Sequence, residues 1–321
     1  MALRWFRKEN PDGVFGPSST AEEVTAGVDA SGLVAIVTGG TSGLGLETVR
    51  VLTLRGARVF LAARNLDSAA KAREEILKQQ PNANINLLKV DVSSMSSVRQ
   101  AAEEFLSLNL PLNLLVNNAG STTDKFRLTE DGIEEQFATN YLGAFLLTEL
   151  LLEKMKITAQ QSGVEGRIVN VASMVHRDTY KSGIEYDTIK TSQGYNWLAS
   201  YGQSKLAMIL HAKELTRRLR EEEANVTINS LHPGAITTNL LRDIAGVFHA
   251  ISAVYISLWG KDIPQGAATQ CYVALNPDVK GVSGEYFDDC KVSQPTAFGR
   301  DPELAKKLWD FTLVLLKECE K

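Results

Sequence analysis

The sequence contains few cysteines. Cys271, Cys290 and Cys319 are odd in number, and none belongs to a CxxC pair or lies at metal-binding spacing from a histidine. A disulfide framework uses an even set of cysteines, and a zinc site uses clustered Cys and His ligands. We therefore expect reduced, structural thiols and no metal site.

Long apolar runs and a large excess of one charge are also missing. No run reaches the roughly 18 residues of a membrane span, and the N-terminus lacks the apolar core of a signal peptide. The first eight residues, MALRWFRK, are basic and aromatic. We expect a solvated arm there, with a peripheral membrane contact or an organelle signal as alternatives. The net charge of −4 gives no overall attraction to nucleic acid, so no nucleic-acid partner is expected.

From residue 33 onward, short apolar runs alternate with longer amphipathic runs. This alternation predicts an α/β fold: a single doubly wound Rossmann domain, residues 33–321, with a seven-stranded parallel sheet. Residues 1–32 are expected to form an N-terminal extension packed on that domain. The predicted strands are residues 34–37, 59–62, 85–90, 112–116, 167–171, 227–231 and 284–287. The predicted helices are residues 44–55, 66–80, 96–107, 131–155, 199–222, 265–275 and 302–317.

A glycine-rich turn, TGGTSGLG at residues 38–45, joins the first strand to the first helix. Glycines let backbone N–H groups and a helix N-terminus approach a diphosphate closely. A tight turn without a ligand is the simpler interpretation, but the position between strand and helix favours a dinucleotide site. The candidate contacts are Gly39, Thr41, Ser42, Gly43, Leu44 and Gly45.

The next strand ends carry residues suited to the rest of a dinucleotide. Arg64 stands where an acidic residue would bind the ribose hydroxyls, and a guanidinium there favours NADP(H) over NAD(H) because it can pair with the 2′-phosphate. Asp91 and Val92 follow the third strand, where the carboxylate can accept the adenine amino group. NNAG at residues 117–120 can close over the adenosine or brace the sheet. Its cofactor candidates are Asn118, Ala119 and Gly120.

Tyr201 and Lys205 are four residues apart and so share one face of a predicted helix. Lowering the pKa of a tyrosine from about 10 to near 7 requires roughly 4 kcal/mol, and a neighbouring cation is one of few sources of that energy. The spacing therefore indicates an acid/base pair. By itself it is weak evidence, because any exposed helix can carry Tyr and Lys so placed.

With Ser173 after the fifth strand and Asn140 in the motif NYLG, these features resemble the short-chain dehydrogenase/reductase family. The resemblance covers about residues 33–290 and includes the Pro-Gly pair at residues 233–234. Within the family, the chain is similar to the plant retinol-dehydrogenase-like reductases, including the type associated with the chloroplast inner-envelope translocon.

The resemblance implies a role for each residue of the catalytic set. Tyr201 would donate a proton to a carbonyl, or accept one from an alcohol, while Ser173 would hydrogen-bond the carbonyl oxygen. Lys205 would hold the nicotinamide ribose and lower the pKa of Tyr201, and Asn140 would hold a water that links Lys205 to solvent. After the sixth strand, the resemblance adds four cofactor residues: Pro233, Gly234, Ile236 and Thr238.

The substrate region departs from the family. Residues 121–123 are STT where relatives often carry apolar residues, so we expect a more polar pocket floor. Ala172 stands where many relatives carry a second serine before Ser173. Aromatic and apolar residues in segments 174–200 and 239–263 predict a lid, near residues 236–263, over a lipophilic substrate. Packing of these side chains on the core, or an oligomer contact, is the alternative.

Residues 305–317 predict a helix with basic ends and one apolar face. Calmodulin targets and membrane-surface helices share this pattern, but a docked terminal helix is the simpler interpretation.

Together these features predict an NADPH-dependent reductase of a hydrophobic aldehyde or ketone, reversible toward the alcohol. The alternative is an NADP(H)-sensing partner of a membrane assembly in which turnover is incidental. The resemblance is compatible with a homo-oligomer and with a cytoplasmic or chloroplast-associated location.

Overall fold

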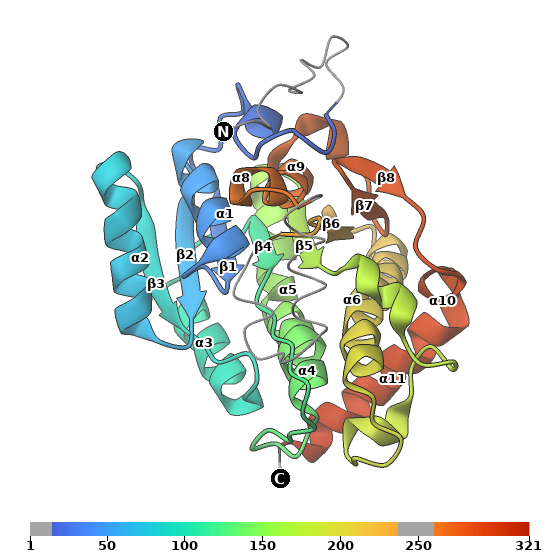
Figure 1. The fold of residues 1–321 in the computed structure, drawn as a ribbon. Coiled ribbons are helices and arrows are strands. Elements are labelled where there is room, and N and C mark those ends of the chain that lie inside the picture. Colours follow the sequence, from blue (N-terminus) through green and yellow to red (C-terminus); the bar gives the residue numbers. More distant parts are fainter. Residues whose placement is uncertain (1–14, 237–259, 321) are drawn as a thin grey trace, which may run out of the picture.

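The computed structural model describes residues 15–236 and 260–320. An eight-stranded sheet of order β3-β2-β1-β4-β5-β6-β7-β8 runs through the molecule, from β3 at one edge to β8 at the other (Figure 1). Its strands are β1 (Val34–Thr38), β2 (Arg58–Ala63), β3 (Ile85–Lys89), β4 (Leu114–Asn117), β5 (Gly166–Val171), β6 (Val226–His232), β7 (Tyr286–Asp288) and β8 (Lys291–Ser293). Strands β1 to β7 pair in parallel, which confirms the predicted seven-stranded parallel sheet.

The eighth strand was not predicted. It pairs antiparallel with β7 through a two-residue turn, Asp289 and Cys290, whose φ angles are 49° and 62°. Two successive left-handed residues give the backbone twist that a two-residue hairpin needs. The strand has only three residues, none of them buried, so it carries no apolar pattern that a sequence reading could detect.

Helices cover both faces of the sheet, so the central strands are buried on both sides and are nearly continuous apolar runs. In β1, Val34 and Ile36 join the core on one face, and Ala35 and Val37 join the core on the other. The first face is covered by α3 (Met95–Ser107), α5 (Gly143–Ser162) and α6 (Trp197–Glu221). The second face is covered by α1 (Gly43–Leu54), α2 (Leu66–Gln79) and α9 (Ala268–Leu275). Short helices α8 (Ile263–Gly266) and α10 (Ala297–Arg300) complete the connections.

The helix predicted for residues 131–155 is divided in the structure. It consists of α4 (Glu135–Phe137), a π-helical turn (Ala138–Leu142) and α5. Glu134 begins it by accepting a hydrogen bond from the N–H of Phe137 at 2.8 Å. A π-helical turn holds an extra residue, and such turns concentrate at functional sites. The residue at its centre is Asn140.

The two ends of the described chain pack on this core. Near the N-terminus, Thr20 and Glu23 exchange side-chain to backbone hydrogen bonds of 2.8 and 3.3 Å, and the Asn276 amide donates to the carbonyl of Val24 at 2.8 Å. At the other end, α11 (Pro302–Glu318) packs against α6 with Trp309 buried, so the docked interpretation of this helix is correct. No helix among the described residues is long and apolar enough to cross a membrane.

All three cysteines are free, as the sequence predicts. Cys271 and Cys290 are buried, and burial raises the pKa of their thiols to about 12 and about 11. Both thiols therefore stay protonated and act as apolar packing groups.

Gly143 is the close contact that lets α5 lie against Val92, in the segment that follows β3. A Cβ atom at this position would lie 2.0 Å from the carbonyl oxygen of Val92. Alanine normally stabilises a helix by about 1 kcal/mol relative to glycine, but overpacking costs about 1–3 kcal/mol. We expect Gly143→Ala to lower the free energy of unfolding measured by urea denaturation.

Gly16 supplies the matched control, because a Cβ added there meets no atom within 4 Å. Gly16→Ala should leave the midpoint unchanged. A Gly143→Ala variant as stable as the wild type would show that α5 can move away from β3 at no cost.

Candidate active site

The predicted catalytic residues come together at the carboxyl end of the sheet. Tyr201 and Lys205 lie one turn apart on α6, with exposed fractions of 7% and 4%. Ser173 lies two residues after the end of β5 and is also buried. Asn140 is fully buried in the π-helical turn. Three parts of the chain therefore hold these side chains in one place.

Lys205 is fixed by the strand that precedes Ser173. Its Nζ donates to the carbonyl oxygen of Val171 at 3.0 Å and lies 5.7 Å from the ring centroid of Tyr201. Burial lowers the pKa of Lys205 to about 8. A Cβ at position 120 would lie 3.3 Å from this Nζ, so Gly120 leaves room beside the ammonium.

The pKa of Tyr201 shifts in the direction opposite to the one that the Tyr-Lys spacing predicts. Burial raises the pKa of Tyr201 to about 12, and a hydrogen bond with the Ser173 side chain opposes this rise. The Tyr-Lys spacing alone predicts a lowered pKa. In the structure both groups are buried, so that loss of water disfavours the phenolate form of Tyr201 and the ammonium form of Lys205 alike. Tyr201 is therefore a protonated acid at neutral pH.

His176 holds the backbone of Ser173. Its Nε2 accepts from the Thr296 N–H at 3.2 Å, so Nδ1 carries the ring proton and donates to the Ser173 carbonyl at 2.7 Å. Burial lowers the pKa of His176, which keeps this donor and acceptor arrangement neutral. His176 is thus a packed loop histidine and not a second acid/base.

Asn140 ties two neighbouring segments to the catalytic helix. Its amide bonds both backbone groups of Ser121, at 2.7 and 2.9 Å, and donates to Ser204 Oγ at 2.9 Å. Ser204 in turn donates to the carbonyl of Tyr201 at 2.7 Å. The sequence reading missed Ser204, although its place between Tyr201 and Lys205 was the available signal.

The polar floor predicted from residues 121–123 contains two unpaired hydroxyls. Ser121 Oγ and Thr122 Oγ1 are buried without a hydrogen-bond partner, whereas the Thr123 N–H donates to the Gln136 side chain at 3.3 Å. Buried hydroxyls of this kind normally bond to something.

The glycine-rich turn leaves the start of α1 open. Ser42, the N-cap residue, makes no side-chain cap, so the first N–H groups from Gly43 onward lack a side-chain acceptor. Gly39 has φ +68°, and a Cβ on Gly45 would lie 2.2 Å from the Gly39 oxygen. Thr41 and Leu44 lie in the same turn and first helical residues.

Asn117 and Asn118 brace the sheet. The Asn117 amide donates to Asn170 at 2.9 Å on β5, and the Asn118 amide donates to the Thr38 carbonyl at 2.8 Å. Thr38 Oγ1 accepts from the N–H groups of Asn118 and Ala119, both at 3.0 Å. These bonds hold the 118–120 loop against the glycine-rich turn, the bracing alternative that the sequence left open.

Arg64 follows the end of β2, and Asp91 follows the end of β3, the strand at the edge of the sheet. The Arg64 side chain is 73% exposed and its Nη1 lies 4.0 Å from Asp91 Oδ2. An exposed pair at this distance contributes little to stability, so the guanidinium is free to meet a ligand. Asp91 Oδ1 accepts from Ser93 Oγ at 2.6 Å, and Val92 is buried beneath α5.

The loop after β6 is held by a lysine that the sequence reading missed. Gly234 has φ +98°, and a Cβ there would lie 2.7 Å from Lys261 Cδ. The Lys261 N–H donates to the Ala235 carbonyl at 2.8 Å, and Lys261 Nζ forms an ion pair with Asp289. Pro233 and Ile236 lie in the same loop, and Ile236 forms a bridge with Lys261. Thr238 lies outside the described residues.

The predicted lid is only partly described. Tyr195 bonds Gln136 at 3.1 Å, Tyr180 accepts from the Asn196 N–H at 3.1 Å, and Tyr186 packs on Phe311. These aromatic side chains therefore pack on the protein, the alternative stated for them. Residues 237–259, which make up most of the predicted lid at 236–263, lie outside the described residues.

Comparison with known proteins agrees with this geometry. The family model for short chain dehydrogenase matches residues 33–192. Short-chain dehydrogenase TIC 32 B, chloroplastic, of Brassica napus is 55% identical over 94% of each chain. Retinol dehydrogenase 11 of Mus musculus is 37% identical over 91% of this chain and 89% of its own. A crystal structure of an uncharacterized Mycobacterium paratuberculosis protein has a TM-score of 0.73 and 27% identity, covering 94% of this chain and 98% of that one.

A buried Ser, Tyr and Lys beside an open glycine-rich helix start, and relatives that match along nearly the whole chain, lead to one conclusion. The chain belongs to the short-chain dehydrogenase family and is an oxidoreductase with a single-domain Rossmann fold.

Proposed function

We propose that this protein is an NADPH-dependent reductase of a lipophilic aldehyde or ketone, with alcohol oxidation as the reverse reaction. The observation that carries the proposal is the buried Tyr201 hydroxyl, which is hydrogen-bonded to Ser173 and lies one helical turn from Lys205. A protonated phenol in a desolvated site can donate its proton to a basic oxygen of a substrate.

The residues present fit a dinucleotide. The uncapped start of α1 and the absence of side chains at Gly39 and Gly45 leave a cradle that a Cβ would fill. Backbone N–H groups at a helix N-terminus favour a diphosphate. Gly39, Thr41, Ser42, Gly43, Leu44 and Gly45 would hold it; Asp91, Val92, Asn118, Ala119 and Gly120 would hold the adenosine side; and Pro233, Gly234 and Ile236 would hold the nicotinamide side.

When bound, the cofactor supplies the hydride. The chain's own residues supply the proton and its stabilisation. Tyr201, whose pKa burial raises to about 12, carries the proton that the carbonyl oxygen receives. Ser173 Oγ stabilises the developing charge on that oxygen. Lys205, held by the carbonyl of Val171, stabilises the phenolate left on Tyr201 and orients the ribose.

A lipophilic substrate is supported by two observations. Relatives with 37% identity are named retinol dehydrogenases, and Met174, the residue after Ser173, is 39% exposed. The unpaired hydroxyls of Ser121 and Thr122 add polar groups to the floor. We therefore expect a substrate that combines an apolar body with a polar group near the carbonyl.

We also propose a chloroplast-associated location, because both Brassica relatives are named chloroplastic. A second role, as an NADP(H)-sensing partner of a membrane assembly, is supported by the same likeness, and it is compatible with turnover. Homo-oligomer formation stays a prediction.

Tyr201→Phe tests the acid. This change removes the hydroxyl and keeps the ring, so we expect carbonyl-dependent NADPH oxidation to fall by at least about a thousandfold while NADPH binding, measured by fluorescence, stays within about twofold. Tyr180→Phe, a tyrosine outside the catalytic set, is the control. Turnover that survives in Tyr201→Phe would refute the assignment.

Arg64→Ala tests the cofactor preference. Loss of a guanidinium that pairs with the 2′-phosphate should raise the Kd for NADPH by about tenfold or more and leave the Kd for NADH nearly unchanged. Lys71→Ala, on the exposed side of α2, removes a similar charge and should change neither value. Equal losses for the two cofactors would contradict the role of Arg64.

A further inference from the structure

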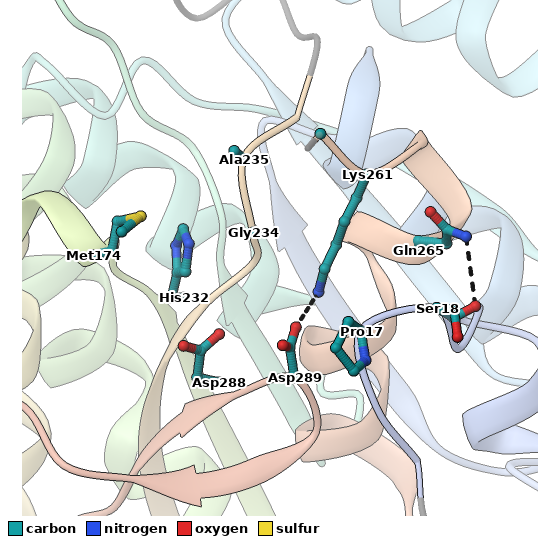
Figure 2. A pocket seen from close by; sticks show the side chains of 11 residues that line it. Pro17, Ser18, Met174, His232, Gly234, Ala235, Lys261, Gln265, Asp288 and Asp289 are labelled. Atoms are coloured by element: carbon teal, nitrogen blue, oxygen red, sulfur yellow. Dashed lines mark hydrogen bonds and ion pairs between the residues drawn. The ribbon is translucent and has the colours of Figure 1, made fainter. Parts of the chain in front are cut away.

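A cavity of about 350 Å³ lies beside the candidate active site (Figure 2). It touches that site at two residues: Met174, which follows Ser173, and Gly234 in the loop after β6. Ser173, Tyr201 and Lys205 do not line it. The rest of its wall comes from the ends of β6 and β7, from Ala235, Gly260, Lys261 and Gln265, and from Pro17 and Ser18 of the N-terminal extension. The volume suits a small ligand or one end of a larger molecule.

His232 is the polar group in this wall that the protein itself does not satisfy. It is the last residue of β6, it is 8% exposed, and its Nδ1 is buried without a hydrogen-bond partner. Figure 2 shows its ring between Met174 and the backbone of Gly234. Burial lowers the pKa of His232 to about 4, so the ring is neutral at physiological pH. A neutral imidazole has one donor and one acceptor nitrogen, and a hydroxyl group can satisfy either.

The acidic residues of the wall differ in their partners. Asp289 is already paired with Lys261, whereas Asp288 makes no ion pair within the described part of the chain. Burial and the like charge of Asp289 raise the pKa of Asp288, whereas the charges of Lys261 and Arg177 and a hydrogen bond from the Asp289 N–H oppose that rise. A carboxylate accepts hydrogen bonds and repels anions. The wall of the cavity therefore disfavours a phosphate or carboxylate ligand. His232 and Asp288, which are neighbours in the sheet, offer two positions at which the hydroxyl groups of a ligand can bond.

We propose that this cavity binds a neutral, hydroxyl-bearing group, with one hydroxyl donating to Asp288 and a second bonding to the imidazole of His232. Two sources share this chemistry: the far end of the reductase's own substrate, or a free polyol. The first source rests on the proposed function, and the second does not.

Direct binding tests the cavity without turnover. Saturation-transfer NMR with xylitol as the probe should show binding to the wild-type protein and its loss in Asp288→Asn and in His232→Phe, which keeps the ring and removes both nitrogens. Lys291→Gln, an exposed change on β8, is the control and should bind xylitol normally. Far-ultraviolet circular dichroism establishes that each variant is folded, and Asp288→Asn keeps the test decisive if His232→Phe fails to fold.

Kinetics distinguish the two sources. Two aliphatic aldehydes of equal length, one ending in a methyl group and one in a vicinal diol, are compared with NADPH. If the substrate's own end occupies the cavity, the diol lowers KM by about tenfold, a gain expected of one or two net hydrogen bonds. That advantage disappears in Asp288→Asn, while the methyl-ended aldehyde keeps its wild-type KM and kcat.

The outcomes separate this inference from the proposed function. Xylitol binding that depends on Asp288, with no diol advantage, assigns the cavity to a free polyol. Reduction of the methyl-ended aldehyde with neither xylitol binding nor a diol advantage overturns the inference and leaves the reductase intact. Asp288-dependent xylitol binding in a protein that reduces no aldehyde leaves the cavity assigned and refutes the reductase.

Discussion

The site depends on the burial of two ionisable side chains on one face of α6. Tyr201 and Lys205 are 7% and 4% exposed, and burial disfavours the charged form of each. Hydrogen bonds hold both residues in place. The Val171 carbonyl accepts from Lys205, the Ser173 side chain bonds Tyr201, and Ser204 donates to the Tyr201 backbone carbonyl. Without these bonds the folded state would be less stable, because each buried donor left unpaired costs about 1–3 kcal/mol of folding free energy.

The same constraint explains the segments around the pair. The π-helical turn carries Asn140, which bonds both Ser121 and Ser204, and Gly143 lets α5 start close against Val92 directly after that turn. On the other side, His176 fixes the carbonyl of Ser173 by a bond to its neutral ring. Tyr201 is thus positioned by rigid strand ends and helix starts. The parts of the chain that contact a substrate can vary around it.

The sequence predicted the parallel sheet for a clear physical reason, because buried strands are apolar runs of regular length. The spacing of Tyr201 and Lys205 and the family resemblance suggested the catalytic set, whose side chains the structure brings together and whose catalytic roles stay a prediction. It did not predict β8, because three exposed residues after a left-handed turn carry no pattern. It did not predict Lys261, which contacts residues distant in the sequence, such as Asp289. It also did not predict Ser204, which lies inside the Tyr-Lys motif and bonds Asn140. In the protein without cofactor, burial raises the pKa of Tyr201, whereas the Tyr-Lys spacing predicts a lowered one, because spacing shows the neighbouring cation but not the loss of solvent around both groups.

The state of Tyr201 is the most direct test of this account. Nuclear magnetic resonance of ring-labelled tyrosine, with Tyr201→Phe used to assign the signal, reports ionisation of this phenol in the protein without cofactor. The account predicts that Tyr201 is still protonated at about pH 10, where a free tyrosine is half ionised, because burial raises its pKa to about 12. A phenol that is half ionised near pH 7 would contradict it, and would show that Lys205 controls the pair in place of burial.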